Sequence, residues 1–250
     1  MIIYPLGVGG AFTERFYHNN YLVDHKLLID AGTTLRYSLK EAGYTYKDIK
    51  TIVITHFHSD HIGGLEELLL KSYWNFNNNV HLPIRPTIVL PRPLVKPFKQ
   101  LLQHGLLNQG MKLEDYCNLH VVNQVYSDHD YRIEFIDTTN LHCEEMVSYG
   151  LKITELTKNI NFVFSSDIKN LYPSKLRENI DDKTVAIFQD IQFSNNPVHA
   201  SLDEVLTYYS KDTYHKIFAM HYPDNIEKQL QYLLTHEIKI ARQGEAILLK

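Results

Sequence analysis

Several kinds of protein are excluded by what this chain of 250 residues has little of. Two cysteines, Cys117 and Cys143, are too few for a disulfide framework and point to a reducing compartment. The longest apolar runs, such as Leu68–Leu70, fall far short of the ~20 residues that cross a membrane. The first residues lack the basic and apolar segments of a signal peptide. We therefore expect a cytoplasmic protein with no membrane partner.

Positive charge is also scarce. Lys and Arg number 25 against 29 Asp and Glu, which gives a formal net charge of −4 at pH 7. A strongly basic surface of the kind that binds long nucleic acids is therefore not expected. No Gly/Ser linker, internal repeat or low-complexity stretch divides the chain, so we predict a single domain over residues 1–250.

Short strands and helices are expected along the whole chain, and their mixture in both halves is typical of an α/β or α+β layered protein. The expected strands are 21–23, 26–29, 51–54, 87–90, 120–122, 131–136, 151–157, 161–164, 185–190 and 216–220. The expected helices are 33–42, 62–71, 95–107, 201–209 and 226–234.

One motif dominates the chemistry of the chain, which has 14 histidines. The pattern His-x-His-x-Asp-His follows the β-branched strand 51–54 and consists of His56, His58, Asp60 and His61. Two positions apart on an extended segment, His56 and His58 point the same way. Asp60 and His61 fall at the turn into the next helix, where they can face a second metal. Neutral imidazoles and a carboxylate are preferred ligands of a Zn²⁺-class ion, so the motif predicts a metal site rather than a polar loop.

Four further candidates lie at or near the ends of predicted strands later in the chain, where a layered fold can hold ligands rigidly around one edge. They are His142, Asp167, His199 and His221.

With these residues the chain resembles the metallo-β-lactamase superfamily, whose signature is His-x-His-x-Asp-His followed by a His, an Asp and a last His. The resemblance extends over nearly the whole chain and implies an α+β fold, a four-layer αββα sandwich. It also implies two divalent metal ions per chain at one edge, with zinc the expected ion and manganese the alternative. It assigns His56, His58 and His142 to the first metal, Asp60, His61 and His221 to the second, and Asp167 to both.

Within the superfamily the chain is similar to the phosphodiesterases that resemble tRNase Z. Four stretches carry this likeness: 7–10, 30–32, 148–151 and 190–201. In that subgroup an acidic residue and a His together donate a proton, which implies roles for Asp190, where Glu is more usual, and His199. The resemblance thus makes Asp60, Asp190 and His199 the catalytic candidates, Asp60 orienting the attacking hydroxide. A structural role for Asp190 and no role for His199 are the alternatives.

The absence of an inserted arm narrows the range of possible substrates. The tRNase Z family has an inserted arm rich in Gly and basic residues, whereas the interval from Asn123 to His142 leaves room only for a turn. The aromatic residues Tyr73, Trp74 and Phe76 can stack on a nucleobase, or form a hydrophobic plug or a dimer contact. A basic group is expected to be a solvated face. It consists of Arg85, Arg92, Lys96 and Lys99.

A compact chain with an intact motif and no arm resembles the phage anti-Pycsar phosphodiesterases. The resemblance implies hydrolysis of cyclic mononucleotides such as cCMP, cUMP, cAMP and cGMP to nucleoside monophosphates, which counters host Pycsar signalling. It also implies a homodimer that acts in the host bacterial cytoplasm. The alternatives are a tRNA 3′-processing endonuclease, a lactonase-type hydrolase and a catalytically inactive binding module.

Overall fold

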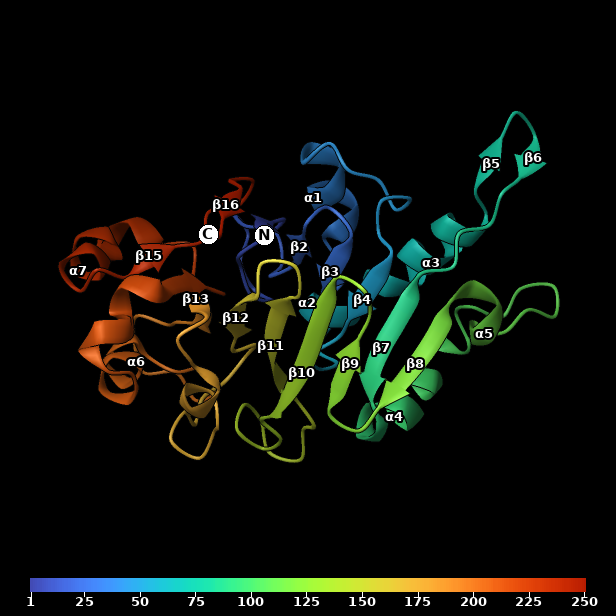
Figure 1. Cartoon of the computed structure of the whole chain (residues 1–250). Helices are drawn as coiled ribbons and strands as arrows, with labels where there is room; N and C mark the ends of the chain where they lie inside the picture. The colour runs from blue at the N-terminus through green and yellow to red at the C-terminus, as the bar shows by residue number, and fades with distance from the viewer.

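The computed structural model describes residues 1–250 and is built around two seven-stranded sheets (Figure 1). The first sheet has the spatial order β16 (Ile247–Leu248), β1 (Ile2–Pro5), β2 (Tyr21–Val23), β3 (Leu27–Ile29), β4 (Thr51–Val53), β7 (Thr87–Pro91) and β8 (Asn118–Val122). The second has the order β15 (Lys239–Ile240), β14 (Ile217–Met220), β13 (Thr184–Asp190), β12 (Ile160–Phe164), β11 (Tyr149–Glu155), β10 (Tyr131–Asp137) and β9 (Val125–Ser127).

The two sheets pack against each other through apolar side chains. The ring of Tyr21 in β2 lies edge-on to those of Phe164 in β12 and Phe188 in β13, each with centroids 5.3 Å apart. All three residues are buried, and burial of such rings is the main favourable contribution to folding.

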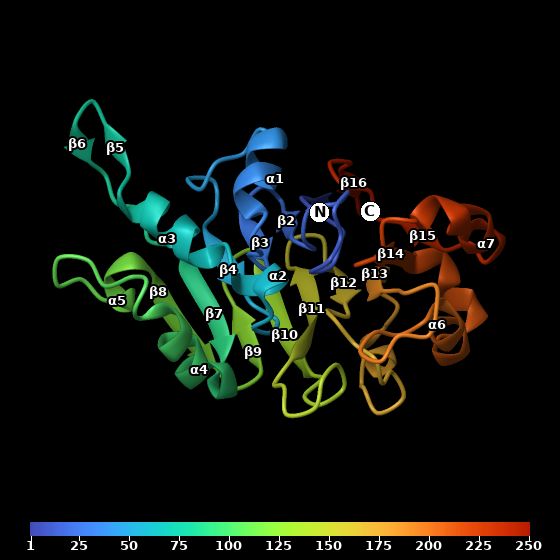
Figure 2. The same cartoon turned by 180° about the vertical axis from the view of Figure 1, so that it is seen from behind.

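Helices are divided between the two halves of the molecule (Figures 1 and 2). The half with the first sheet carries α1 (Leu35–Glu41), α2 (Ser59–Ile62), α3 (Leu65–Tyr73), α4 (Arg92–Leu102) and α5 (Leu113–Tyr116). The half with the second sheet carries α6 (Leu202–Tyr208) and α7 (Leu230–Thr235), besides three short 3₁₀ segments, Arg177–Asn179, Lys211–Lys216 and Ile226–Gln229. This is the expected α+β sandwich. No helix combines the length and the apolar character that crossing a lipid bilayer requires.

Strand direction brings the functional loops to one edge. In the second sheet β12, β13 and β14 are parallel, and β10 runs in the same direction because both it and β12 are antiparallel to β11. The carboxyl ends of these strands therefore lie at one edge. The segment after β4 meets the same edge, where Tyr149 N donates to Thr55 O at 3.1 Å and Ser166 Oγ donates to Thr55 Oγ1 at 2.8 Å.

The expected helices have different bounds in the structure: α1 and α6 are slightly shorter than expected, and the helix expected over 226–234 is divided into the 3₁₀ segment Ile226–Gln229 and α7. The helix expected over 62–71 is α3, which begins at Leu65 and follows a separate turn of helix, α2, because the chain packs tightly against the loop after β3 at Gly64. A Cβ at this position would lie 2.3 Å from the carbonyl oxygen of Gly32. The helix expected over 95–107 begins at Arg92 and ends at Leu102, since Pro93 is well suited to the first helical turn.

Some short elements were not predicted. They are β1, β5 (Phe76–Asn77), β6 (Val80–His81), β9, β15, β16 and α5. The interval from 123 to 142, in which a turn was expected besides the strand 131–136, contains β9 as well as β10, and both belong to the sheet and form no projecting arm. Runs of two to four residues show too little periodicity for their type to be read from sequence.

Candidate metal centre

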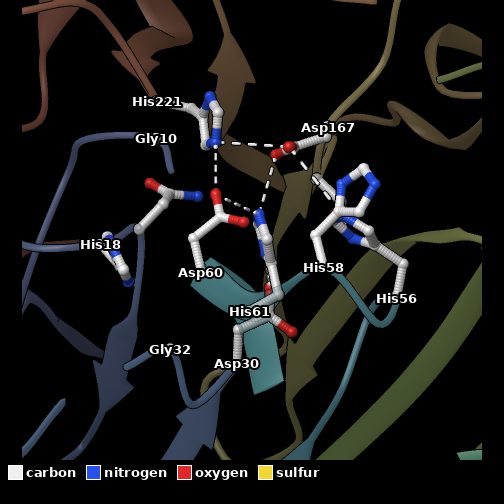
Figure 3. A network of polar contacts seen from close by, with 12 residues as sticks. Gly10, His18, Asp30, Gly32, His56, His58, Asp60, His61, Asp167 and His221 are labelled. Atoms are coloured by element: carbon white, nitrogen blue, oxygen red, sulfur yellow. Dashed lines mark hydrogen bonds and ion pairs between the residues drawn. The ribbon is translucent and has the colours of Figure 1, made fainter. Parts of the chain in front are cut away.

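The seven residues proposed as metal ligands meet at the shared edge of the two sheets (Figure 3, in which all but His142 are labelled). Four come from the first sheet's side, two from the segment that links β4 to α2 and two from α2 itself, and three follow strands of the second sheet. They are His56, His58, Asp60 and His61 from the first half, with His142 after β10, Asp167 after β12 and His221 after β14.

The first donor group consists of His56, His58, His142 and Asp167. His58 Nδ1 lies 3.1 Å from both His56 Nε2 and His142 Nε2. Asp167 Oδ2 lies 3.9 Å from His56 Nε2 and 3.7 Å from His142 Nε2. His56 and His58 therefore point towards the same place, as expected, although His56 does so with Nε2 and His58 with Nδ1.

The second donor group consists of Asp60, His61, Asp167 and His221. His61 Nε2 lies 3.4 Å from Asp60 Oδ2 and 3.3 Å from Asp167 Oδ1. His221 Nε2 lies 3.3 Å from Asp60 Oδ2 and 3.3 Å from Asp167 Oδ2. Asp167 is common to both groups, so the structure places it between them.

These donor atoms fit divalent metal ions. A tetrahedral ion with bonds of ~2.0–2.1 Å holds its donors about 3.3 Å apart, close to the spacings in both groups. Moreover, His61 Nε2 and Asp167 Oδ1 are buried and have no hydrogen-bond partner. Buried polar atoms are rarely left unsatisfied, and a cation would satisfy both.

Neighbouring groups fix which ring nitrogen faces the centre. His61 Nδ1 donates to Asp30 Oδ2 at 2.7 Å, and His142 Nδ1 donates to the carbonyl of Val198 at 2.7 Å. Both rings therefore turn Nε2 towards the centre, the arrangement that supports a metal ligand once Nε2 carries no proton. Asp30 is itself held by Thr55, whose N and Oγ1 each donate at 2.8 Å.

The electrostatics of the two donor groups differ. Burial, reinforced by neighbouring imidazoles, lowers the pKa of His56 and His58, so these rings are neutral and their lone pairs are available. Burial opposes charge on His61 too, but the carboxylates of Asp167, Asp30 and Asp60 raise its pKa well above the ordinary value. The second group thus carries negative charge that a proton or a metal cation must balance, and metal binding releases the proton.

His199 and Asp190 form a pair beside the donor groups. His199 Nδ1 donates to Asp190 Oδ2 at 2.7 Å, and the His199 ring stacks on His221 with centroids 4.7 Å apart. Burial lowers the pKa of His199, but the Asp190 carboxylate outweighs it and raises the pKa to about 9. Asp190 Oδ2 also accepts from the N–H of Ile168, next to Asp167. The pair is therefore coupled to the loop that carries the shared carboxylate.

The backbone at the centre is held in uncommon conformations. Asp30, Ser166 and His221 have φ of 60°, 55° and 53°, in the left-handed region that costs of order 1–3 kcal/mol for a residue with a side chain. Gly10 passes so close to His221 that a Cβ would lie 2.5 Å from Cε1 of its ring. The surrounding structure therefore has to hold these loops in place.

The centre opens into a cleft of about 780 Å³. Six of the titratable residues described above line it: His58, Asp60, His142, Asp167, His199 and His221. Asp190 lies behind His199 and does not reach the wall, so within this site His199 is the group of the pair that can meet a substrate.

Other sequence candidates lie elsewhere. The segment with Tyr73, Trp74 and Phe76 leads into the β5–β6 hairpin, which projects from the body and does not line the cleft of its own chain (Figure 1). The basic residues Arg85 and Lys99 contact the segment around Glu114 and are likewise outside the cleft. Stacking of a substrate base on the hairpin is therefore not supported within one chain.

Some site residues escaped the sequence reasoning. Asp30 stood in a noted Asp-Ala-Gly stretch but was given no role, and its position directly after a strand was the available signal. His18, which the sequence motifs did not single out, is buried near Asp60 and is hydrogen-bonded to Thr33 Oγ1 at 3.0 Å (Figure 3). The contact made by the carbonyl of Val198 could not be predicted, because a backbone carbonyl is present at every residue.

The family model described as "Anti-Pycsar protein Apyc1" matches residues 1–247. The chain belongs to the anti-Pycsar protein family. An anti-Pycsar protein Apyc1 of Bacillus phage vB_BveM-Goe7 is 33% identical over 260 residues, which cover 98% of this chain and 96% of the relative. The resemblance to the anti-Pycsar family that was drawn from the sequence is thereby confirmed.

Solved structures support the fold of this anti-Pycsar family member. Human tRNase Z, short form, superposes with a TM-score of 0.71 at 12% identity, covering 100% of both chains. The metallo-β-lactamase fold protein YhfI from Bacillus subtilis gives a TM-score of 0.69 at 15% identity, covering 98% of both chains. The chain has the metallo-β-lactamase fold, as the sequence motif predicted.

Proposed function

We propose that the protein is a metal-dependent phosphodiesterase that hydrolyses 3′,5′-cyclic mononucleotides to nucleoside 5′-monophosphates. The observation that carries the proposal is that two donor groups sharing Asp167 lie on the same cleft wall as His199, which is charged by Asp190. This combination provides for the binding of a phosphodiester and for protonation of its leaving oxygen.

Two divalent ions are the proposed cofactors, zinc first and manganese as the alternative. His56, His58 and His142 would hold one, Asp60, His61 and His221 the other, with Asp167 contributing to both. When bound, such ions polarise the phosphoryl oxygens and lower the pKa of water, so that hydroxide is available near neutral pH. Nitrogen-rich donor sets favour zinc-class ions over magnesium or calcium.

The chain's own residues supply positioning and proton transfer. Hydroxide, formed when water releases a proton to the solvent, is the attacking group; the carboxylate of Asp60, on the cleft wall, accepts a hydrogen bond from it and orients its oxygen towards phosphorus. As the new O–P bond forms, the bond from phosphorus to O3′ breaks, and His199 delivers its Nε2 proton to the departing O3′. Asp190 holds the His199 ring by Nδ1 and keeps it protonated for this step.

The proposed substrate class rests on family membership, on the absence of an arm and on the net charge of the chain. The family's name refers to Pycsar, the antiviral signalling that uses cyclic mononucleotides, so we propose cCMP, cUMP, cAMP and cGMP as substrates. The interval 123–142 forms β9 and β10 and no arm that would hold a tRNA. A net charge of −4 also disfavours a long polyanion. A homodimer in the host bacterial cytoplasm completes the proposal.

A substrate screen tests the function. Purified protein would be assayed with cyclic mononucleotides, cyclic dinucleotides, precursor tRNA and an acyl-lactone, each at 50 and 200 mM salt. Rapid release of 5′-monophosphates with weak salt dependence is expected, because few phosphates are engaged. Preferential cleavage of precursor tRNA, with a steep salt dependence, would indicate a processing endonuclease. Preferential lactone opening would indicate a lactonase.

A further inference from the structure

The cleft is larger than a cyclic phosphate requires, and the part away from the donor groups has a distinct character. Its walls come from the loop after β1, the segment after β13 and the segment after β14. No Lys or Arg lines it. Two phenylalanines, Phe12 and Phe193, and the amides of Asn225 and Gln229 do. This part of the wall thus carries aromatic rings and amides and one carboxylate, Asp224, which accepts backbone N–H groups, and it has no cation that would bind a second phosphate.

Phe12 is exposed on a loop that is firmly held. Its side chain is 96% exposed, the highest value among the large apolar residues. Thr13 closes the loop, with its N and Oγ1 both donating to Gly10 O. On the other side of Phe12, the backbone N–H groups of Glu14 and Arg15 donate to Asp224 at 2.9 and 3.2 Å. These hydrogen bonds on both sides of Phe12 fix the backbone, which therefore holds the ring exposed to solvent at the rim of the cleft.

From these observations we propose that Phe12, with Phe193 on the same cleft, forms a subsite that takes the nucleobase of the substrate by ring stacking. The inference rests on the proposed function and adds the residues that hold the base. A base offers a flat, uncharged ring with polar edges, which matches an aromatic wall bordered by Asn225 and Gln229. Every base has a stacking face, so the subsite distinguishes a substrate with a base from one without.

The test uses two substrates that differ only in the base. One is 3′,5′-cyclic AMP, and the other is the base-free 1-deoxyribose 3′,5′-cyclic phosphate, which keeps the 2′-hydroxyl. Alanine substitution of a stacking aromatic costs about 5- to 150-fold per base. We expect Phe12→Ala to lower kcat/KM for cyclic AMP by that factor, mainly through KM, and to leave the base-free substrate unchanged. Phe12→Trp should restore the value, and Tyr37→Ala, an exposed aromatic on α1 outside the cleft, should change neither substrate.

Binding gives a second measurement. Calorimetric titration with a hydrolysis-resistant cyclic AMP phosphorothioate should show a matching loss of affinity in Phe12→Ala. Since Phe12 is almost fully exposed, the variant should fold normally. Equal kinetics of wild type and Phe12→Ala on cyclic AMP would overturn the subsite. So would an equal loss on both substrates, or a change of oligomeric state with unchanged nucleotide affinity. Failure of the wild type to hydrolyse cyclic AMP would instead overturn the proposed function.

Discussion

The first half of the molecule supplies four of the seven donor residues within positions 56 to 61, whereas the second half supplies three that are spread from position 142 to position 221. In the first half a strand end and one turn of helix set the spacing of the donors. In the second half the spacing depends on how β10, β12 and β14 are aligned in the sheet. The same centre is thus positioned locally on one side and by tertiary structure on the other.

The largest effect is expected where the two halves meet, at Asp167. Asp167→Ala removes the one donor common to both groups, so metal content should fall and hydrolysis should drop to the assay background, because hydroxide is no longer available at neutral pH. Elemental analysis of purified protein and a cyclic nucleotide assay measure this. Asp60→Ala, which affects one group only, should retain more metal than Asp167→Ala. Full metal content in Asp167→Ala would contradict the shared role.

The next effect concerns the second half alone. His199→Ala should lower kcat for a cyclic nucleotide by about 10²–10⁴-fold, because an alkoxide leaves poorly without a proton. Metal content should stay at the wild-type level. Against a nitrophenyl phosphodiester the loss should be small, since that group leaves unprotonated. Asp190→Asn should give a milder version of the same pattern. An equal loss on both substrates would mean that His199 stabilises phosphoryl charge instead.

A smaller effect is expected in the first half, at the carboxylate that orients His61. Asp30→Asn should weaken metal binding by about 10–100-fold, the usual cost of losing such a partner. Competition with a chelator of known affinity measures this, and excess metal should restore the rate. Asp182→Asn, an exposed acid far from the centre, is the matched control. Unchanged affinity in Asp30→Asn would mean that local backbone geometry alone orients His61.

The smallest effect is expected from an ion pair far from the centre, which links β11 to the segment before β13 in the second sheet. Lys152 Nζ and Asp181 Oδ2 are 2.6 Å apart, and Asn161 Nδ2 also donates to Asp181 at 2.9 Å. Partial burial opposes ionisation, but Lys152 and Asn161 outweigh it and lower the pKa of Asp181. Its stabilising contribution is therefore present above the unfolded pKa of about 4 and lost as pH falls below it.

Asp181→Asn should reduce the free energy of unfolding by up to about 1 kcal/mol at pH 7 and by less at pH 3. Urea unfolding at both pH values measures this, while the hydrolytic rate at pH 7 stays unchanged. A large loss of activity would show that strand alignment in the second half is less robust than the sheet suggests.

The contrast between donors positioned by local structure and donors positioned by tertiary structure explains what could be predicted from the sequence. His56, His58, Asp60 and His61 were found because a local motif fixes both residue types and spacing. Asp190 was singled out only through the likeness to tRNase Z-type enzymes, which also gave a role to His199, a candidate from its place after a strand; the structure does place the two in contact. The overall fold followed from the same likeness and is confirmed.

What could not be predicted depends on contacts between distant segments. The carbonyl of Val198 orients His142 across 56 positions of sequence, and no side chain records it. The β-branched strand β4 was recognisable, but β16 has two residues and exists only through its pairing with β1. The split between α2 and α3 arises because Gly64 contacts a loop more than thirty positions earlier.

The β5–β6 hairpin, which pairs only with itself, makes the crossover between β4 and β7 tolerant of changes in length. Its tip is formed by Asn78 and Asn79, both with positive φ, and it stands clear of both sheets (Figure 1). Added residues at such a tip cost little, because loop-closure entropy grows only with the logarithm of loop length. A peptide epitope inserted between Asn78 and Asn79 would therefore label the protein while leaving the catalytic edge intact.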